Sequence, residues 1–555
     1  MPNVAKPSSS SPLRWMYAVW VVVIGAFAVL HAMNLAADFP NHTPWYIDWA
    51  KYTDEGWYGN AAVRAHLFGH WYVPGDFNPA PAVPVWPFLE WILFFFTGVN
   101  IEAARGLAIA FFFANLILCY TLLRPRSPKW VALLALTLLV TSPFLYCFSR
   151  LAILEPMLTT LMLAALNITV RLPQMRRPVA TAAGIGVLFT LMILTKTTAV
   201  FLLPAIAWAM FAAFWERGEA SALSTRSSLR AWFHQRALRC AASAGTAFVV
   251  SFGAWMALVV ALGYYGDYKY LLFINKYVKP TEFYWPLLSF WWSLHASIWV
   301  DRILMPLSGM LIVAVLIAAT IFRKQSEWAS QLITDPVFGA CILAAGGYIL
   351  FMTYQNHPQP RYFALVAVFC FLIIAIAIGR FSEEAGIRRI LGYGAVALAS
   401  IASIVNGAVT MNFAAHPEYT FVNATRALTS YIDHHPNGNR LLLSISGDEI
   451  TLITHLQSLC DDFSMHTPQL PDLSAKLAHY KPGWWATWND IDPGTLEDLH
   501  TRYSLEQVAT FKAFDDPERN VLVLFKLHPL PEPRIIEGNN LQQPLPGDKI
   551  DIMVE

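Results

Sequence analysis

The chain has 555 residues, of which 56% are apolar and only 14% are charged, and its mean hydropathy is positive. This composition excludes an ordinary soluble domain and indicates a membrane protein that crosses the bilayer several times. The formal net charge of +1 gives no electrostatic case for a nucleic-acid partner or for an acidic one.

The N-terminal region predicts a retained first span. Residues 1–14 are rich in Ser and Pro and are expected to form a cytoplasmic tail. The apolar stretch 15–37 is too long for the core of a signal peptide and has no persuasive cleavage site.

Five of the six cysteines fall within or beside apolar stretches and none has CxxC spacing, which argues against a disulfide framework and against a cysteine metal site.

Eleven apolar stretches are long enough to cross about 30 Å of hydrocarbon as helices of roughly 20 residues. The predicted spans are 15–37, 103–123, 130–147, 156–171, 179–195, 197–215, 240–263, 303–322, 337–355, 362–379 and 390–411. The stretch 85–98 is shorter and contains a proline and a glutamate. If it does not cross, the basic loops all face the cytoplasm with Arg14, as the positive-inside rule requires. We therefore expect a helix at 85–98 in the outer interface, anchored by Trp86 and Trp91.

With this topology the outer face carries the first loop, 38–102, and everything after about residue 412. Residues 412–555 have ordinary polarity and alternate strand-like runs such as RLLLSIS with helix-like runs such as TLEDLHTRY. We therefore divide the chain into the tail 1–14, a transmembrane domain at 15–411 and a small extracytoplasmic α/β domain at 412–555. The sequence has no GxGxxG, Walker or HExxH motif that would indicate a nucleotide site or a zinc protease.

Short motifs lie at the outer ends of several predicted spans. An acidic pair, Asp54 and Glu55, lies within TDEGWYGNAAV and is followed by the Pro-rich segment FNPAPAVPVWPFLEW. The other motifs are AAR at 103–105, SRLAILEP ending at 155–156, LTKTTAVFLLP around Lys196 and QPRYFALVAVF around Arg361.

This ordered set of motifs resembles the polyprenyl-phosphate-dependent glycosyltransferases with the GT-C fold, and is most similar to the protein O-mannosyltransferases and the bacterial aminoarabinose transferases. The resemblance covers roughly residues 15–410. It implies a GT-C-like α-helical bundle of about eleven transmembrane helices plus outer interfacial helices, and a donor sugar carried on a polyprenyl phosphate. The Pro-rich segment lacks the lysine of the aminoarabinose transferases, and Glu155 stands where family members often have Asp, so the sugar stays open.

Transfer of a sugar from a lipid phosphate needs a base for the acceptor hydroxyl, and cations or hydrogen-bond donors for the leaving phosphate. We predict Asp54 as the base, with Glu55 orienting the acceptor or the loop; the choice between the two rests on the resemblance. Glu155 is the third predicted catalytic residue and is expected at the N-terminal mouth of the fourth span, because Pro156 suits the first turn of a helix. The alternatives are solvated loop carboxylates and, for Glu155, a helix cap or an ion pair with Arg150.

Cations at the outer boundary of the bundle are candidates for binding the donor phosphate. We predict this role for Lys196 and Arg361, together with Arg150, because boundary cations are costly and often mark a phosphate site. Snorkelling anchors are the alternative. The further candidate contacts with substrate are Tyr58, His357, Tyr362 and Lys269. No cofactor is certain, and His357 is the candidate ligand if a divalent metal ion takes part.

The favoured function is an inverting glycosyltransferase that moves a hexosyl or pentosyl group from an undecaprenyl- or dolichyl-phosphate donor to an acceptor hydroxyl at the extracytoplasmic membrane face. Its expected partners are the lipid-linked donor, an acceptor glycan, lipid or protein, and the membrane lipids. A secondary transporter, with ionisable groups near the bilayer midplane, and a non-catalytic scaffold are the alternatives. The short N-terminus and compact loops favour a bacterial inner membrane, with the N-terminus cytoplasmic and the C-terminal domain periplasmic.

Overall fold

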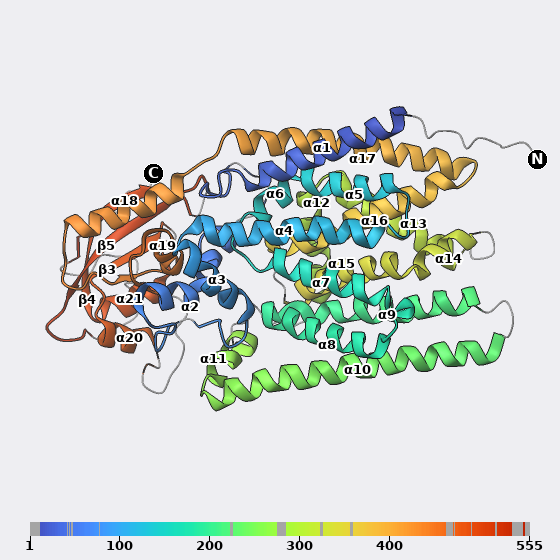
Figure 1. Ribbon diagram of the computed structural model, residues 1–555. Coiled ribbons are helices and arrows are strands. Elements are labelled where there is room, and N and C mark those ends of the chain that lie inside the picture. The colour runs from blue at the N-terminus through green and yellow to red at the C-terminus, as the bar shows by residue number, and fades with distance from the viewer. Residues whose placement is uncertain are drawn as a thin grey trace, which may run out of the picture.

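The molecule has two parts, a long bundle of helices and a smaller α/β domain attached to one end of it (Figure 1). The computed structural model describes residues 11–41, 43, 45, 48–76, 78–221, 226–274, 285–321, 326–355, 359–461, 470, 472–489, 491–516, 519–534 and 548–549.

The bundle consists of apolar helices that follow the predicted spans. They are α1 (Ser11–Ala32), α4 (Ile101–Leu123), α5 (Lys129–Thr141), α6 (Pro143–Ser149), α7 (Glu155–Thr169), α8 (Pro178–Thr195), α9 (Leu203–Ser221), α10 (Arg226–Ala261), α13 (Leu304–Thr320), α15 (Pro336–Gln355), α16 (Phe363–Glu383) and α17 (Ile387–Ala415). Within the described part of the chain, 8 helices are long and apolar enough to cross a membrane, and the bent pair α5 and α6 makes up to 9. The two remaining predicted spans are the shorter helices α7 and α13, of 15 and 17 residues. The prediction of a multi-pass helical membrane protein is confirmed.

The bend between α5 and α6 has a local cause. The two helices meet at 67° because Pro143 starts α6 and cannot donate a backbone hydrogen bond to α5. Ser142 caps the new helix, since its hydroxyl accepts a hydrogen bond from the backbone N of Leu145 at 3.2 Å. The bend carries the chain toward Arg150 and the start of α7.

Helix α16 is the centre of the bundle. The 18-residue apolar window within Pro360–Glu383 has a mean hydropathy of 2.8 and is 100% buried inside the molecule, whereas only 6% of the corresponding window of α10 is buried. A helix that is apolar on every side belongs in a core, and an apolar helix left exposed is suited to lipid. Arg361 lies in the short helix directly before α16, at one end of the bundle.

The C-terminal part is an α/β domain, as predicted. Its elements are α18 (Thr420–His434), β1 (Leu442–Leu443), α19 (Gly447–Thr454), β2 (Ser458–Leu459), α20 (Leu473–Tyr480), β3 (Trp484–Trp488), α21 (Pro493–His500), β4 (Tyr503–Lys512) and β5 (Val521–Pro529). The strand order is β2-β1-β3-β5-β4, with parallel pairs at β1 and antiparallel pairs at β5. Trp484 and Trp485 on β3 are both fully buried and belong to different core clusters, because successive side chains of a strand point to opposite faces.

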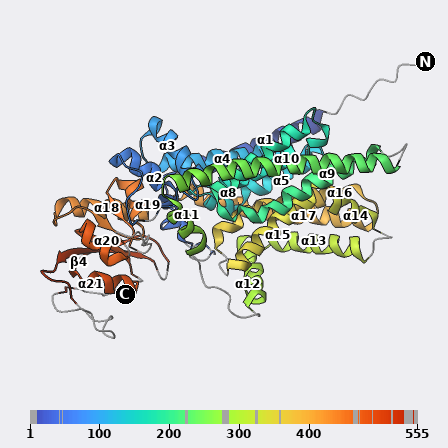
Figure 2. The ribbon, with the colours of Figure 1, turned by 90° about the horizontal axis from the view of Figure 1, so that it is seen from below.

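The first loop contains short helices that lie between the bundle and this domain. They are η1 (Trp49–Lys51), α2 (Asp54–Phe68) and α3 (Val85–Thr97), and α3 is the helix expected at 85–98. The same end of the bundle also holds α11 (Tyr265–Lys269) (Figures 1 and 2). The other short elements are η2 (Leu172–Gln174), η3 (Thr197–Leu202), the π-helix η4 (Tyr270–Ile274), α12 (Trp285–Val300), α14 (Glu327–Thr334) and η5 (Pro360–Tyr362).

Candidate active site

Arg361, in η5 at the start of the central helix, contacts two carboxylates of the first loop. Its Nε lies 3.0 Å from Asp54 Oδ2, and its Nη1 forms an ion pair with Asp48 Oδ1. The backbone N of Arg361 also donates to Asp48 Oδ2 at 2.7 Å. All three residues are buried, with 1–4% of their surface exposed. The structure thus places a predicted catalytic residue, Asp54, against a predicted phosphate-binding residue, Arg361, and adds Asp48, an acid that the sequence patterns did not single out.

Glu155 and Lys196 form the second buried ion pair of the site. Glu155 is the first residue of α7, as expected, and its Oε1 pairs with Lys196 Nζ, from the link between α8 and η3. The alternative ion pair of Glu155 with Arg150 is not formed. Glu155 Oε2 is buried and accepts no hydrogen bond from any residue that the structure describes. Glu155 therefore keeps acceptor capacity that the fold does not use.

Tyr362 connects the two ion pairs. Lys196 Nζ lies 4.5 Å from the centroid of its ring, and the guanidinium carbon of Arg361 lies 4.9 Å from the same centroid. Cations at these distances are attracted to the face of an aromatic ring. Five of the predicted residues therefore lie in one cluster, namely Asp54, Glu155, Lys196, Arg361 and Tyr362. They come from α2, α7, η5 and the link between α8 and η3.

The protonation of Asp54 is set by burial and by its charged neighbours. Burial raises the pKa of Asp54 from 3.8 to about 6, Arg361 opposes the rise, and the negative charge of Asp48 adds to it. Burial and the charge of Asp54 raise the pKa of Tyr58, one turn further along α2, well above its usual value. A carboxyl whose pKa is about 6 is ionised at pH 7 and is still basic enough to take a proton from a reacting hydroxyl.

Glu55 is held on a different side of α2 from Asp54. Its Oε1 accepts hydrogen bonds from Arg105 Nε at 2.8 Å and from the backbone N of Ala152 at 2.7 Å, and its Oε2 accepts from Arg105 Nη2 at 2.6 Å. Arg105 in turn donates to the carbonyl oxygens of Leu35 and Ala37. These bonds tie α2 to α4 and to the segment before α7. They fix Glu55 in the fold, and its role in orienting the acceptor or the loop stays a prediction.

Among the described residues, Arg150 and Lys269 take no part in these ion pairs. Arg150 donates to Tyr146 Oη at 2.6 Å and to the carbonyl oxygen of Asn34 at 2.6 Å, so the fold itself uses this guanidinium. Lys269 is exposed at the C-terminal end of α11. His357 lies outside the residues that the structure describes. Among those residues, no group of three or more His, Cys, Asp or Glu side chains is arranged to hold a metal ion.

Asp48 is the residue that sequence reasoning missed. It is a single acid among aromatic residues, in the run WYIDWAK, with no spacing that marks chemistry. Its Oδ1 also accepts a hydrogen bond from the backbone N of Ala50 at 2.8 Å, which caps η1. An Asp before a short helix is a recognisable cap signal, but that signal says nothing of the ion pair with Arg361.

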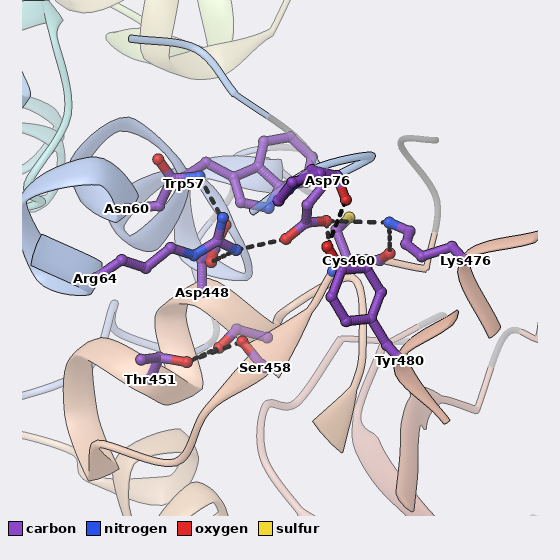
Figure 3. A network of polar contacts seen from close by, with 12 residues as sticks. Trp57, Asn60, Arg64, Asp76, Asp448, Thr451, Ser458, Cys460, Lys476 and Tyr480 are labelled. Atoms are coloured by element: carbon purple, nitrogen blue, oxygen red, sulfur yellow. Dashed lines mark hydrogen bonds and ion pairs between the residues drawn. The ribbon is translucent and has the colours of Figure 1, made fainter. Parts of the chain in front are cut away.

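A separate buried network ties α2 to the α/β domain (Figure 3). Arg64 of α2 forms ion pairs with Asp448 of α19, at 2.8 Å, and with Asp76. Asp76 Oδ1 accepts a hydrogen bond from Lys476 Nζ of α20 at 3.1 Å, and Asp448 Oδ2 accepts one from Asn60 Nδ2 at 3.1 Å. We call these five residues the junction network. It fixes the domain against the first loop.

The contact between α2 and α19 is close enough to require glycine. A Cβ atom added to Gly56 would lie 2.1 Å from the backbone N of Glu449. No side chain fits there without moving one of the two helices. The α/β domain is therefore packed directly on the helix that begins with Asp54.

The fold and the site define a multi-pass helical membrane protein with buried carboxylates and cations at the end of its bundle, beside an α/β domain. A family model described as dolichyl-phosphate-mannose-protein mannosyltransferase matches residues 79–233. A comparison with curated protein sequences finds no match.

Solved structures identify the fold. ArnT from Cupriavidus metallidurans in the apo state aligns with a TM-score of 0.57 at 13% identity, over 92% of this chain and 98% of that chain. The same protein bound to undecaprenyl phosphate aligns with a TM-score of 0.55 at 12% identity, over 91% and 98%. The oligosaccharyltransferase of Archaeoglobus fulgidus in the apo form aligns with a TM-score of 0.50 at 13% identity, over 91% of this chain and 76% of that chain. The chain has the GT-C fold, and the resemblance predicted from its motifs is confirmed.

Proposed function

We propose that this protein is an inverting glycosyltransferase that moves a sugar from a polyprenyl-phosphate donor to an acceptor hydroxyl at the extracytoplasmic face of a bacterial inner membrane. The observation that carries the proposal is the convergence of Asp54, Arg361, Glu155 and Lys196 in one buried cluster at the end of the bundle. A base and two cations are the groups that this reaction needs. ArnT, which shares the fold, has been solved with undecaprenyl phosphate bound.

The proposed reaction is a single displacement at the anomeric carbon. The acceptor oxygen attacks this carbon while Asp54 takes the hydroxyl proton. The bond from the anomeric carbon to the phosphate oxygen breaks, and the electron pair of that bond goes to the phosphate. Arg361 and Lys196 stabilise the charge that develops on the leaving phosphate. Because one displacement occurs, the configuration of the anomeric carbon is inverted.

The cations have to be shared with the carboxylates that already hold them. Asp54 and Asp48 occupy two nitrogens of Arg361, and Glu155 pairs with Lys196. A guanidinium has five N–H groups, so Arg361 can bind a phosphate while it keeps carboxylate partners. In this proposal Glu155 acts by holding Lys196 at the site, and the carboxylates keep both cations neutralised until the donor enters.

An apolar cavity beside the site suits the lipid part of such a donor. Its volume is about 400 Å³, and it lies between α2, α3 and the C-terminal end of α10. Ala61 and Ala65 line it from α2, and Trp91 and Trp255 line it from the two other helices. Ala61 is seven residues after Asp54, which corresponds to roughly 10 Å along a helix. We propose that part of the polyprenyl chain binds in this cavity.

The experiment that tests the function is a transfer assay with purified protein in detergent. Polyprenyl-phosphate donors with different radiolabelled hexoses and pentoses are supplied with an acceptor extract from a bacterial envelope, and the anomeric configuration of the product is determined by NMR. Asp54→Asn is expected to lower the rate by about 10²- to 10⁴-fold. Asp433→Asn, in an exposed ion pair with Arg440, is the control and should retain the wild-type rate.

Three results would contradict the proposal. A product of retained configuration would exclude the single displacement. Full activity of the Asp54→Asn variant would remove Asp54 as the base. Absence of transfer from every donor, while the protein moves a donor or another solute across vesicles, would favour the transporter.

A further inference from the structure

Asp48 has more contacts with Arg361 than Asp54 has. Its Oδ2 accepts the hydrogen bond from the backbone N of Arg361 at 2.7 Å, and its Oδ1 pairs with Nη1. Its Oδ1 also accepts from the backbone N of Ala50 at 2.8 Å. Only 2% of Asp48 is exposed. Both carboxylate oxygens are therefore used to fix one arginine and the short helix that leads to Asp54.

These bonds connect two segments that are 313 residues apart in sequence. On one side, Asp48 caps η1, which is followed within a few residues by Asp54 at the start of α2. On the other side, it holds both the main chain and the side chain of Arg361. Asp48 thus helps to set the separation of Asp54 from the guanidinium, and in our scheme it contacts neither the reacting proton nor the donor.

We infer that Asp48 is a positioning residue, which holds Arg361 ready for the donor phosphate and limits how much of the arginine's charge acts on Asp54. The inference rests on the proposed function. Arg361 binds Asp48 through Nη1 and Asp54 through Nε, and its Nη2 lies 3.5 Å from Tyr362 Oη. A long contact to a neutral hydroxyl is weaker than an ion pair, so Nη2 is the nitrogen that a phosphate can take most easily.

The same geometry makes Asp48 a control on the protonation of Asp54. Asp48 is a negative charge beside Asp54 and it shares the positive charge of Arg361, and both effects favour the protonated form of Asp54. The negative charge of Asp48 helps burial to raise the pKa of Asp54 to about 6. The charged and titratable groups that face Asp54 are Arg361, Asp48, Lys196, Glu155, Tyr58, Tyr362 and Glu449.

The test compares the pH dependence of kcat/KM for the wild type and Asp48→Asn. The amide keeps the shape of the side chain but removes its charge, so Arg361 acts more strongly on Asp54 and the pKa of Asp54 falls. The acid limb of the profile should therefore move to lower pH. At the optimum, kcat/KM should fall about tenfold because Arg361 is less well held. Asp48→Glu keeps the charge and should keep the acid limb near its wild-type position.

The matched control is Asp38→Asn. Asp38 is a buried acid of the same loop, and its oxygens accept hydrogen bonds from the backbone N atoms of Phe421 and Val422. Its removal should leave the position of the acid limb unchanged. A purely structural Asp48 would lower the rate equally at every pH, and such a parallel loss would overturn the inference.

A second measurement needs no transferase activity. Infrared titration of the carboxyl band that disappears in Asp54→Asn reports the protonation of Asp54 directly, with circular dichroism as the check of folding. A lower midpoint in Asp48→Asn supports the inference even if the proposed reaction is wrong, and an unchanged midpoint in folded protein overturns it. If Asp48→Asn does not fold, Asp48→Ser takes its place: it also removes the charge, so a lower midpoint supports the inference and an unchanged midpoint in folded protein overturns it.

Discussion

Two buried charge networks contact α2, and they differ in how completely their oxygens are used. In the junction network, both oxygens of Asp76 and both oxygens of Asp448 accept hydrogen bonds. In the candidate active site, Asp54 Oδ2 lies near Arg361 without the geometry of a hydrogen bond, and Glu155 Oε2 accepts none from the described residues. We call the first network closed, because both of its carboxylates use all their oxygens. We call the second network open, because some of its carboxylate oxygens accept no hydrogen bond from the described residues.

The difference separates the two roles. Buried polar groups are normally satisfied, because an unsatisfied one costs about 1–3 kcal/mol. A closed network therefore gives stability and a fixed arrangement, as expected at the boundary between a bundle and an attached domain. An open one is kept at a cost, and a ligand can recover that cost on binding. Substitutions in the two networks should consequently affect different properties.

The largest expected effect is on stability, from Arg64→Met in the junction network. The variant leaves Asp448 buried without its ion pair, and breaking a buried pair in this way costs about 3–5 kcal/mol. Thermal unfolding in detergent should show a clear loss, seen first in the α/β domain. The control is Arg440→Met, whose pair with Asp433 is exposed and should contribute less than about 1 kcal/mol. Equal stability of the two variants would contradict the role of the junction network.

The next effect is on activity, from Arg361→Lys in the open site. Lysine keeps the charge but lacks the planar fork that binds Asp48 and Asp54 together. We expect kcat/KM to fall about 10²- to 10³-fold, with thermal stability changed far less than by Arg64→Met. Arg150→Lys is the matched control, because Arg150 contacts Tyr146 and a main-chain carbonyl in the fold. A loss as large for Arg150→Lys would support the predicted role of Arg150 at the phosphate.

A smaller effect is the dependence of the rate on pH. The base has to be ionised, and burial raises the pKa of Asp54 to about 6, with Arg361 opposing. The value of kcat/KM should fall below about pH 6, by tenfold per pH unit, instead of below about pH 4 as for an exposed aspartate. A profile of initial rates in detergent at constant ionic strength measures this. An acid limb near pH 4 would mean that Asp54 is not the base or is not buried in the active state.

The sequence was informative about the spans and less so about the pairing of charges. The apolar helices were predictable because roughly 20 apolar residues suffice to identify a membrane helix, whatever its neighbours. Of the eleven predicted spans, 8, or up to 9 with the bent pair, are long and apolar enough to cross a membrane in the described part of the chain. The roles of Asp54 and Glu55 could not be separated in this way, since adjacent residues of a helix point about 100° apart and only the fold decides what each one meets. Arg361 contacts the first of them and Arg105 the second.

Two residues illustrate what the sequence could not reveal. Asp48 has no motif, and its partner lies 313 residues away, so only the assembled bundle brings the two together. Arg150 resembles a boundary cation in sequence, and two of its N–H groups bind Tyr146 and the carbonyl oxygen of Asn34, so its role at the phosphate stays a prediction. Local patterns identified which groups are charged at this end of the bundle. They could not specify which groups are already paired.

The smallest expected effect comes from Glu449, a buried acid beside the junction network whose two carboxyl oxygens have no hydrogen-bond partner among the described residues. Burial raises its pKa well above 4.5, and Glu55 adds to the rise while Arg105 opposes it. The folded protein therefore keeps a proton that the unfolded chain releases above about pH 4.5, so stability decreases as the pH rises through that range.

Replacing Glu449 with Gln removes this proton uptake while preserving the shape of the side chain. At pH 4 the free energy of unfolding should change by less than about 1 kcal/mol, and at pH 8 the variant should be the more stable protein. Thermal unfolding at both pH values measures the difference. Lower stability of Glu449→Gln at pH 8 would mean that Glu449 is ionised and paired in the folded protein. The acid beside the junction would then belong to a closed network, and the contrast with the open site would be sharper.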